Sequence, residues 1–132
     1  MPHTDSAAIV DRLARFDCVV EIGVGHRPAV AAALADRGVA VTATDVTPRE
    51  VPENVAFVRD DITDPVPEVY ADADAIYGLD LPPELHAPAA SIAREHDAAL
   101  VFTTLGGDPP AVPVEREMLP VETLYWAREG PE

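Results

Sequence analysis

A glycine-rich turn between a strand-like segment and an alanine-rich helical segment is the feature that most constrains the fold of this chain. The apolar run 18–24 contains Gly23 and passes through Gly25 into the helical segment. A second apolar run ends on Asp45, about twenty residues after Gly25. Glycines let a backbone approach a phosphate or sugar closely, and an acidic residue at the end of the next strand is suited to ribose hydroxyls. This order of elements predicts a nucleoside-binding site.

The rest of the hydrophobic pattern alternates between helical and strand-like segments. We expect helices from residues 4–6 to Phe16, over 29–37 with Gly38 as the cap, and over 82–96. We expect strands at 18–24, 39–45, 55–58, 75–77, 98–104 and 122–127. Such alternation predicts an α/β, Rossmann-like three-layer sandwich with a mostly parallel sheet of about six strands, in one domain over residues 1–132.

The segment 106–120 interrupts this alternation. It carries four prolines, too many for a crossover helix, and we expect it to be an ordered loop. Without a crossover helix the last strand, 122–127, is expected to run antiparallel at the edge of the sheet.

The charge of the chain restricts its partners. The formal net charge is −15, and all nine basic residues are arginine. Carboxylates keep a protein hydrated in concentrated salt, so this composition, without any lysine, favours a halophilic cytoplasmic protein over an ordinary acidic one. Nucleic-acid binding needs clustered basic residues and is not expected, and no stretch has the apolar length of a membrane span.

The glycine turn also resembles a known motif. The run Glu21-Ile22-Gly23-Val24-Gly25 is similar to motif I of class I S-adenosylmethionine-dependent methyltransferases. That resemblance implies a minimal methyltransferase core whose cofactor site contains the two glycines and three acidic positions, one of them with two alternatives. These are Glu21 in the motif, Asp45 for the ribose, and Asp60 or Asp61 for the adenine amino group, with Asp80 as the candidate for orienting a methyl acceptor.

The resemblance has departures. Asp80-Leu81-Pro82-Pro83 is similar to the motif IV loop of amino-methyltransferases, with Leu81 inserted and Glu84 in place of an aromatic residue. His26 stands where the third glycine of motif I falls. These departures bear on catalysis more than on cofactor binding. The short length, the glycine turn and the Pro-Pro-Glu-Leu run also resemble a family of uncharacterised short archaeal Rossmann-like proteins, a resemblance that implies no activity.

Several of these residues have a second interpretation. Asp80 has the residue type and position to cap the helix expected from Pro82. Arg27 would pair either with an anionic group of a ligand or with a carboxylate of the site. The single cysteine, Cys18, opens the first strand and is expected to be a small buried residue. The histidines lack metal-ligand spacing, and the run Asp60, Asp61 and Asp64 is expected to be solvated surface, so no metal is expected.

Three functions agree with these observations. The first is an S-adenosylmethionine-binding protein, either a minimal or a degenerate methyltransferase. The second is an NAD-binding protein or reductase, which Gly23, Gly25 and Asp45 fit equally well; Glu21 ahead of the glycines favours the first. The third is a non-enzymatic module with an unused pocket, which would contact a protein partner through the loop 106–120.

Overall fold

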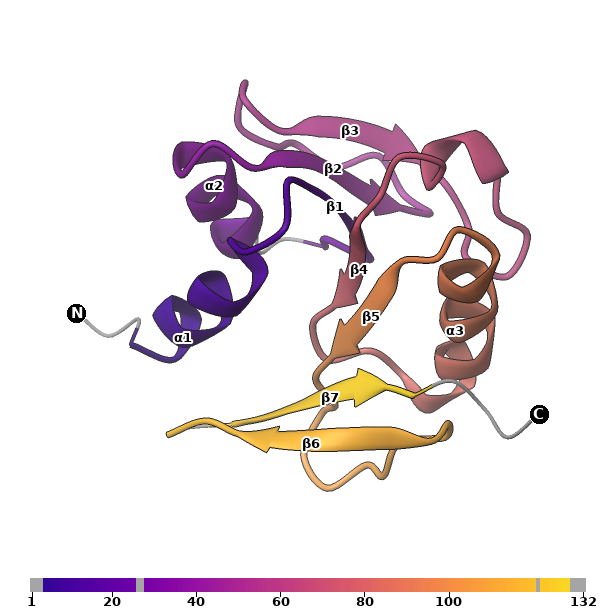
Figure 1. The fold of residues 1–132 in the computed structure, drawn as a ribbon. Helices are drawn as coiled ribbons and strands as arrows, with labels where there is room; N and C mark the ends of the chain where they lie inside the picture. The colour runs from indigo at the N-terminus through magenta and orange to yellow at the C-terminus, as the bar shows by residue number, and fades with distance from the viewer. Residues whose placement is uncertain (1–3, 26–27, 121, 129–132) are drawn as a thin grey trace.

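A seven-stranded sheet with helices on both faces forms the fold in the computed structural model, which describes residues 4–25, 28–120 and 122–128 (Figure 1). The strand order is β3-β2-β1-β4-β5-β7-β6, and β1 to β5 are parallel. The strands are β1 (Cys18–Ile22), β2 (Ala40–Asp45), β3 (Ala56–Arg59), β4 (Ala75–Gly78), β5 (Ala99–Phe102), β6 (Val114–Met118) and β7 (Thr123–Ala127).

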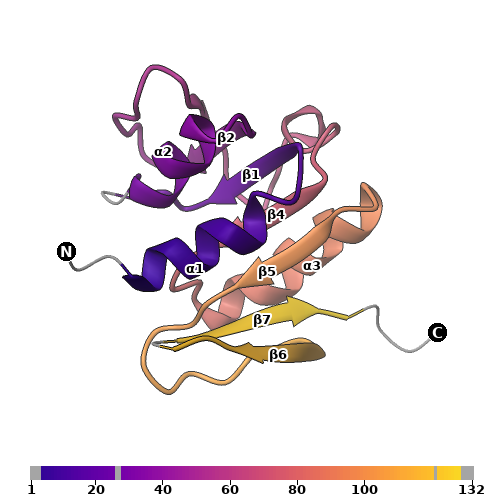
Figure 2. The ribbon, with the colours of Figure 1, turned by 60° about the vertical axis from the view of Figure 1, so that its left-hand side comes forward.

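The helices lie in two layers. Helices α1 (Thr4–Leu13) and α2 (Ala29–Asp36) cover one face of the sheet, and α3 (His86–Glu95) covers the other (Figures 1 and 2). Two short 3-10 helices, η1 (Pro67–Val69) and η2 (Pro83–Leu85), lie in the loops around β4. The expected Rossmann-like three-layer sandwich is therefore confirmed.

The alternation of side chains along each strand divides the core in two. Val19 of β1 and Tyr77 of β4 pack with α1 and α2, whereas Val20 and Ile76 pack with α3. Burying an aliphatic side chain of this size stabilises the folded state by roughly 1.5–3 kcal/mol. Because β1 is covered on both faces, its sequence is apolar almost throughout, and Glu21 is the exception.

The helix ends follow from single residues. Gly38 adopts φ +89° two residues after the end of α2, beyond the cap residue Arg37, and its N–H donates to the carbonyl of Ala35 at 3.0 Å. A residue without a β-carbon adopts this conformation with little strain, so Gly38 ends the helix as expected. Pro88 lies in the first turn of α3, where a missing N–H leaves the helix intact. Helix α1 ends at Leu13, before the expected Phe16.

The structure corrects the expected loop over 106–120. This segment contains β6, which pairs antiparallel with β7 and takes the edge of the sheet. Strand β7 is antiparallel to β5, as expected, but it lies inside the edge. The prolines stand on either side of β6, and every residue of the strand is half-buried or exposed, as is common for an edge strand.

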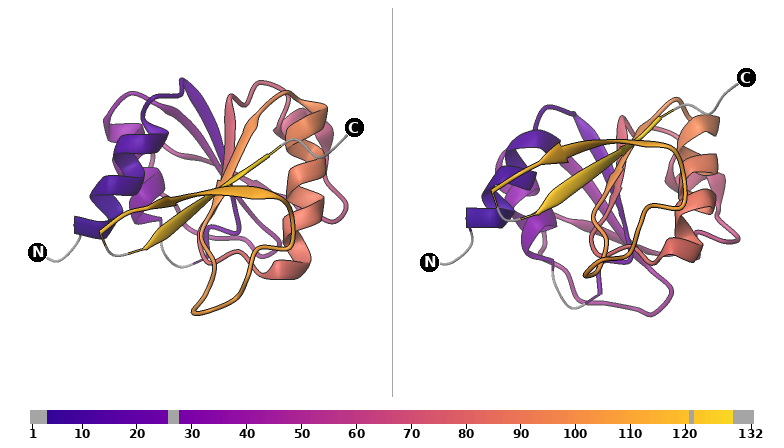
Figure 3. Two further views of the ribbon diagram at one scale, coloured as in Figure 1. Left: turned by 60° about the horizontal axis from the view of Figure 1, so that its bottom comes forward. Right: turned by 90° about the horizontal axis from the view of Figure 1, so that it is seen from below.

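The β6–β7 hairpin is joined to α1 (Figure 3). Glu117 of β6 accepts hydrogen bonds from Nε of Arg12 on α1 and from Nε1 of Trp126 on β7, the latter at 3.0 Å. The ring of Trp126 also lies 6.5 Å from that of Phe16, centroid to centroid. These contacts join the β6–β7 hairpin to the layer of α1.

Candidate functional site

The carboxyl ends of the parallel strands bring the expected acidic residues to one edge of the sheet. Glu21 lies near the end of β1 and Asp45 ends β2, while Asp60 and Asp80 follow β3 and β4. The strand order reverses between β1 and β4. In open α/β sheets, ligands bind in the crevice outside the carboxyl ends of the strands, at such a reversal.

The glycine turn presents bare backbone at this edge. Gly23 has φ +69° and Gly25 has φ +59°, conformations that disfavour a side chain. A β-carbon built on Gly23 would meet nothing within 4 Å, so its backbone faces open space. His26 and Arg27, the next two residues, lie outside the described part of the chain.

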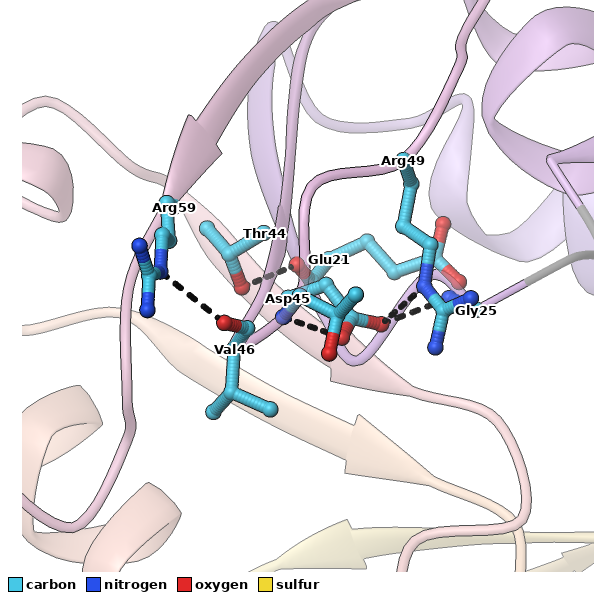
Figure 4. A network of polar contacts seen from close by, with 8 residues as sticks. Glu21, Gly25, Thr44, Asp45, Val46, Arg49 and Arg59 are labelled. Carbon is cyan, nitrogen blue, oxygen red and sulfur yellow. Dashed lines mark hydrogen bonds and ion pairs between the residues drawn. The ribbon is translucent and has the colours of Figure 1, made fainter.

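Asp45 is bound to this turn from the end of β2 (Figure 4). Its Oδ2 accepts the N–H of Gly25 at 2.9 Å, and its Oδ1 accepts the N–H of Thr47 at 3.0 Å. Nε of Arg49 lies 3.5 Å from Oδ2 in an ion pair. Burial opposes ionisation of Asp45, but these N–H groups and the guanidinium outweigh burial and lower the pKa of the carboxyl.

Glu21 forms a buried pair with a tyrosine that sequence reasoning left without a role. Only 1% of Glu21 is exposed, and its Oε1 accepts the hydroxyl of Tyr77 at 2.8 Å. The two residues are register partners in the parallel pair of β1 and β4. The side chain of Thr44 on β2 donates to the carbonyl oxygen of Glu21 at 2.8 Å. Glu21 is thus held from both neighbouring strands.

Asp60 and Asp61, the alternatives for one position, have different surroundings. Asp60 is buried; its Oδ2 accepts the hydroxyl of Tyr70 at 2.7 Å and its Oδ1 accepts the N–H of Val66 at 3.0 Å. Asp61 is exposed and accepts the N–H and hydroxyl of Thr63 in a local turn, which lowers the pKa of its carboxyl. Asp60 therefore organises the loop after β3, and Asp61 faces solvent.

Two hollows flank Asp45. One, of about 310 Å³, opens on the β3 side, and the other, of about 430 Å³, opens beside the glycine turn. Val46 and Val66 in the first are 55% and 50% exposed, an apolar pair among charged neighbours. The first hollow is lined by Val46, Arg59, Asp60, Asp61, Asp64 and Val66, and the second by Gly25, Pro28, Pro48, Arg49 and Glu50.

Asp80 does not cap a helix. Pro82, two residues later, holds the cap position of η2, which has no side-chain capping bond. Leu81 stands between Asp80 and Pro82, and its buried side chain packs on Gly78, with Cδ1 3.0 Å from where a β-carbon of Gly78 would stand. Asp80 adopts φ +52°, and its N–H donates to Oγ1 of Thr103 at 2.7 Å. A non-glycine residue in this region is a strained feature of the kind found at functional sites.

Other chemistries have less support in the described residues. Residues 4–25, 28–120 and 122–128 contain no group of three or more His, Cys, Asp or Glu side chains placed to hold a metal ion. Over the same ranges, no helix has the length and apolar character that crossing a bilayer requires. Burial, followed by the nearby Asp74 and Asp72, raises the pKa of the Cys18 thiol, which disfavours the reactive thiolate.

Comparison with known proteins decides the family. A model of the uncharacterised protein family UPF0146 matches residues 3–128. The chain belongs to this family. A UPF0146 protein of Halobacterium salinarum is 50% identical over 128 residues, which are 96% of this chain and 99% of the relative. A UPF0146 protein of Archaeoglobus fulgidus is 43% identical over 90 residues, covering 68% and 69%. The expected membership of an archaeal family is confirmed.

Solved structures show the fold that this UPF0146 chain shares. An RNA methyltransferase from Salinibacter ruber in complex with S-adenosyl-L-homocysteine matches with a TM-score of 0.64, covering 95% of this chain and 94% of that one at 20% identity. A TehB-like SAM-dependent methyltransferase from Corynebacterium glutamicum matches with a TM-score of 0.65, covering 94% and 87% at 17% identity. The chain therefore has a Rossmann-like methyltransferase fold.

Proposed function

We propose that this protein binds S-adenosylmethionine, or a closely related adenine nucleoside, at the carboxyl edge of its sheet. The observation that carries the proposal is the hydrogen bond from Gly25 to Asp45, which holds an acidic side chain beside an open glycine turn. A carboxylate has about four lone-pair sites; the two N–H groups and the ion pair with Arg49 occupy three of them, which leaves acceptor capacity for a ribose hydroxyl. The methyltransferase fold of the solved relatives supports the same ligand class.

The residues present fit such a nucleoside. The open space over Gly23 would accept the sugar and its substituent without a clash. Val46 and Val66 would contact an adenine ring in the hollow on the β3 side, where Asp60 and Asp61 offer acceptors for its amino group. The carbonyl of Val46 accepts a hydrogen bond from Nε of Arg59 at 3.0 Å, which holds the backbone that lines this hollow. Bound S-adenosylmethionine would supply an electrophilic methyl group.

A minimal methyltransferase would also need a place for the methyl acceptor. Asp80 is the candidate for orienting it, because Asp80 follows β4 beside the reversal of strand order. Its backbone is fixed by Thr103 and by Leu81, whose own N–H donates to the carbonyl of Thr103 at 2.8 Å. An Asp80→Asn variant should keep cofactor affinity and change only transfer to an acceptor.

Titration calorimetry in molar KCl tests the binding proposal. The folded protein should bind S-adenosylmethionine and S-adenosylhomocysteine, and Asp45→Ala should weaken both by about tenfold or more, because a hydrogen bond to a charged group contributes roughly 1.5–3 kcal/mol. Asp11→Asn is the matched control, since Asp11 forms an exposed ion pair with Arg37 on the helices. Binding of NAD without binding of either adenosyl compound would replace the proposal with an NAD-binding function.

A further inference from the structure

Three exposed arginines gather on one side of this acidic protein. Arg94 and Arg128 line a hollow of about 180 Å³ between the end of α3 and the end of β7, and they outnumber Asp97, which lines it too. The guanidinium of Arg116 on β6 lies 5.6 Å from the centroid of the Tyr125 ring. Within the described part of the chain none of these arginines forms an ion pair, although 24 acidic residues face nine basic ones. Their positive charge is therefore available to a partner.

The strand register places these arginines around one apolar surface. Val114 of β6 is opposite Ala127 of β7, and the next pair on that face of the hairpin is Arg116 opposite Tyr125. Ala127 also lines the hollow with Arg128, so the surface is continuous from the hollow to Arg116. We call this surface the arginine face; it consists of Arg94, Arg116 and Arg128 around Val114, Met118 and Tyr125.

Among the described residues, no helix covers the arginine face. Helix α3 lies against β4 and β5, and the segment 103–113 runs from β5 to β6 without a helix. In Figure 3 the hairpin lies between α1 and α3. Met118 is 81% exposed, and Val114 and Tyr125 are half-buried. The helical layer that contains α3 therefore stops short of β6 and β7.

We propose that the arginine face binds an acidic amphipathic helix of another protein, which lies beside α3 and extends this layer over the hairpin. The apolar stripe of such a helix would cover Val114, Met118 and Tyr125. Carboxylates on both sides of the stripe would meet the guanidinium groups, whose planar N–H donors match the geometry of a carboxylate. The surface thus selects its partner by charge as well as by apolar contact.

Two other occupants match the arginine face less well. A second copy of this chain has its helices already packed, because Ile9 and Leu13 of α1 and Leu34 of α2 are buried in its own core. Two copies would also bring together two net charges of −15. Nucleic acid gains its affinity from many clustered basic residues, and it would find three arginines around an apolar centre. A helix with few carboxylates and an apolar stripe matches both features.

A heteronuclear NMR titration of the ¹⁵N-labelled protein in molar KCl tests the proposal. At about 1 M salt the Debye length is about 3 Å, so general repulsion is screened and contacts at the surface remain. The probe is a capped peptide of about 14 residues, with leucines at helical spacing and glutamates beside the leucine stripe. It should shift the amides of β6, β7 and the end of α3. A matched peptide with glutamine for every glutamate should bind about three- to tenfold more weakly.

Variants of the exposed arginines separate charge selection from apolar contact. Arg94→Gln, Arg116→Gln and Arg128→Gln should each weaken the glutamate peptide by about two- to fivefold, and together they should remove its advantage over the glutamine peptide. Arg37→Gln is the matched control, since it removes the same charge next to α2 on the other face of the sheet. Met118→Ser should weaken both peptides equally. Circular dichroism verifies that each variant is folded.

Equal affinity for the two peptides, or an equal loss in Arg37→Gln, would overturn the role of the arginines. No shift at millimolar peptide, or shifts confined to the glycine turn, would overturn the surface itself. Single-stranded RNA that shifted the same amides at lower concentration than the glutamate peptide would replace the acidic helix with nucleic acid. Shifts of these amides with protein concentration alone would replace it with a second copy. Since no nucleoside is added, the result is independent of the proposed function.

Discussion

The N–H of Gly25 donates to Oδ2 of Asp45 at 2.9 Å, which joins the turn after β1 to the end of β2. A second bond, from the N–H of Val24 to the carbonyl of Thr44 at 2.9 Å, supports the same junction. The glycine turn is therefore held in place by β2, the strand that ends on Asp45. Backbone conformation at Gly25 and orientation of the Asp45 carboxylate depend on each other.

Gly25→Ala should test this dependence. A β-carbon at Gly25 would have room, since its nearest neighbour is the carbonyl oxygen of Gly23 at 3.9 Å, but φ is +59°. The left-handed conformation costs a non-glycine residue about 1–2 kcal/mol, so the free energy of unfolding should fall by about that amount. Denaturant unfolding measures it. Gly107→Ala, in open space without a positive φ, should change stability little or raise it slightly. Equal losses in the two variants would contradict the role of the turn.

The lowered pKa of Asp45 predicts how stability depends on pH. Since the folded-state pKa lies below the ordinary value of 3.8, the carboxylate stabilises the fold above pH 3.8. That contribution is lost as pH falls through the lowered folded-state pKa. The stability difference between wild type and Asp45→Asn should therefore be largest near neutral pH and shrink below pH 3.8. Denaturant unfolding at a series of pH values measures it, and a difference that grows on acidification would show that the sign is wrong.

The central part of the fold was predictable because its strands are buried on both faces. Strands such as β1 carry near-continuous apolar runs, and the glycines and prolines at helix ends mark the boundaries. Strand β6 was not predictable in this way. Its residues Val114–Met118 include three charged side chains, because one face meets solvent and the strand lies at the edge of the sheet. A run this short and this polar, without period-two alternation, resembles a loop in sequence.

In the candidate site too, residues that follow one another in a short stretch of sequence were predictable, whereas residues that meet only in the folded sheet were not. Glu21, Gly23, Gly25 and Asp45 follow a local order of strand, turn, helix and strand, which sequence reveals. Tyr77 and Tyr70 were not assigned partners, because their contacts depend on strand register and on the path of a loop. Glu21 and Tyr77 are 56 residues apart in the chain and meet only because β1 and β4 are neighbours. In the sequence, the apolar neighbours of Tyr77 and Tyr70 indicate only that these tyrosines belong to the core.

His86 predicts a link between the loops after β4 and β5. This buried ring accepts the N–H of Ala111 at Nδ1, 2.9 Å away, so its Nε2 carries the proton and donates to the carbonyl of Leu81 at 2.9 Å. His86→Phe should keep the packing against Phe102 and lose both bonds. Two lost hydrogen bonds with a buried carbonyl left unsatisfied should lower the free energy of unfolding by about 1–3 kcal/mol.

Amide hydrogen exchange separates this local effect from general destabilisation. The Ala111 amide should exchange faster in His86→Phe by more than the loss of global stability explains, whereas the amide of Val101 inside β5 should change only by that global amount. Equal acceleration at both amides would show that His86 does not link the two loops.

Salt should stabilise the protein because the exposed carboxylates on its surface repel one another. With 24 acidic residues against nine arginines, the folded chain has a net charge of −15. Raising KCl from about 0.1 M to about 1 M shortens the Debye length from about 10 Å to about 3 Å, so repulsion between exposed carboxylates weakens. The midpoint of thermal unfolding should therefore rise with KCl concentration, as circular dichroism would show.

A charge-reduced variant distinguishes screening from a general effect of salt on hydration. Glu53, Glu68, Asp72 and Asp108 are exposed and lie outside the candidate site. Changing all four to their amides should raise the midpoint in low salt and make the rise with KCl shallower, because less repulsion remains to be screened. Salt that acted only by strengthening the burial of apolar surface would leave the slope unchanged. A parallel rise in the two proteins would therefore rule out surface repulsion as the cause of the salt dependence.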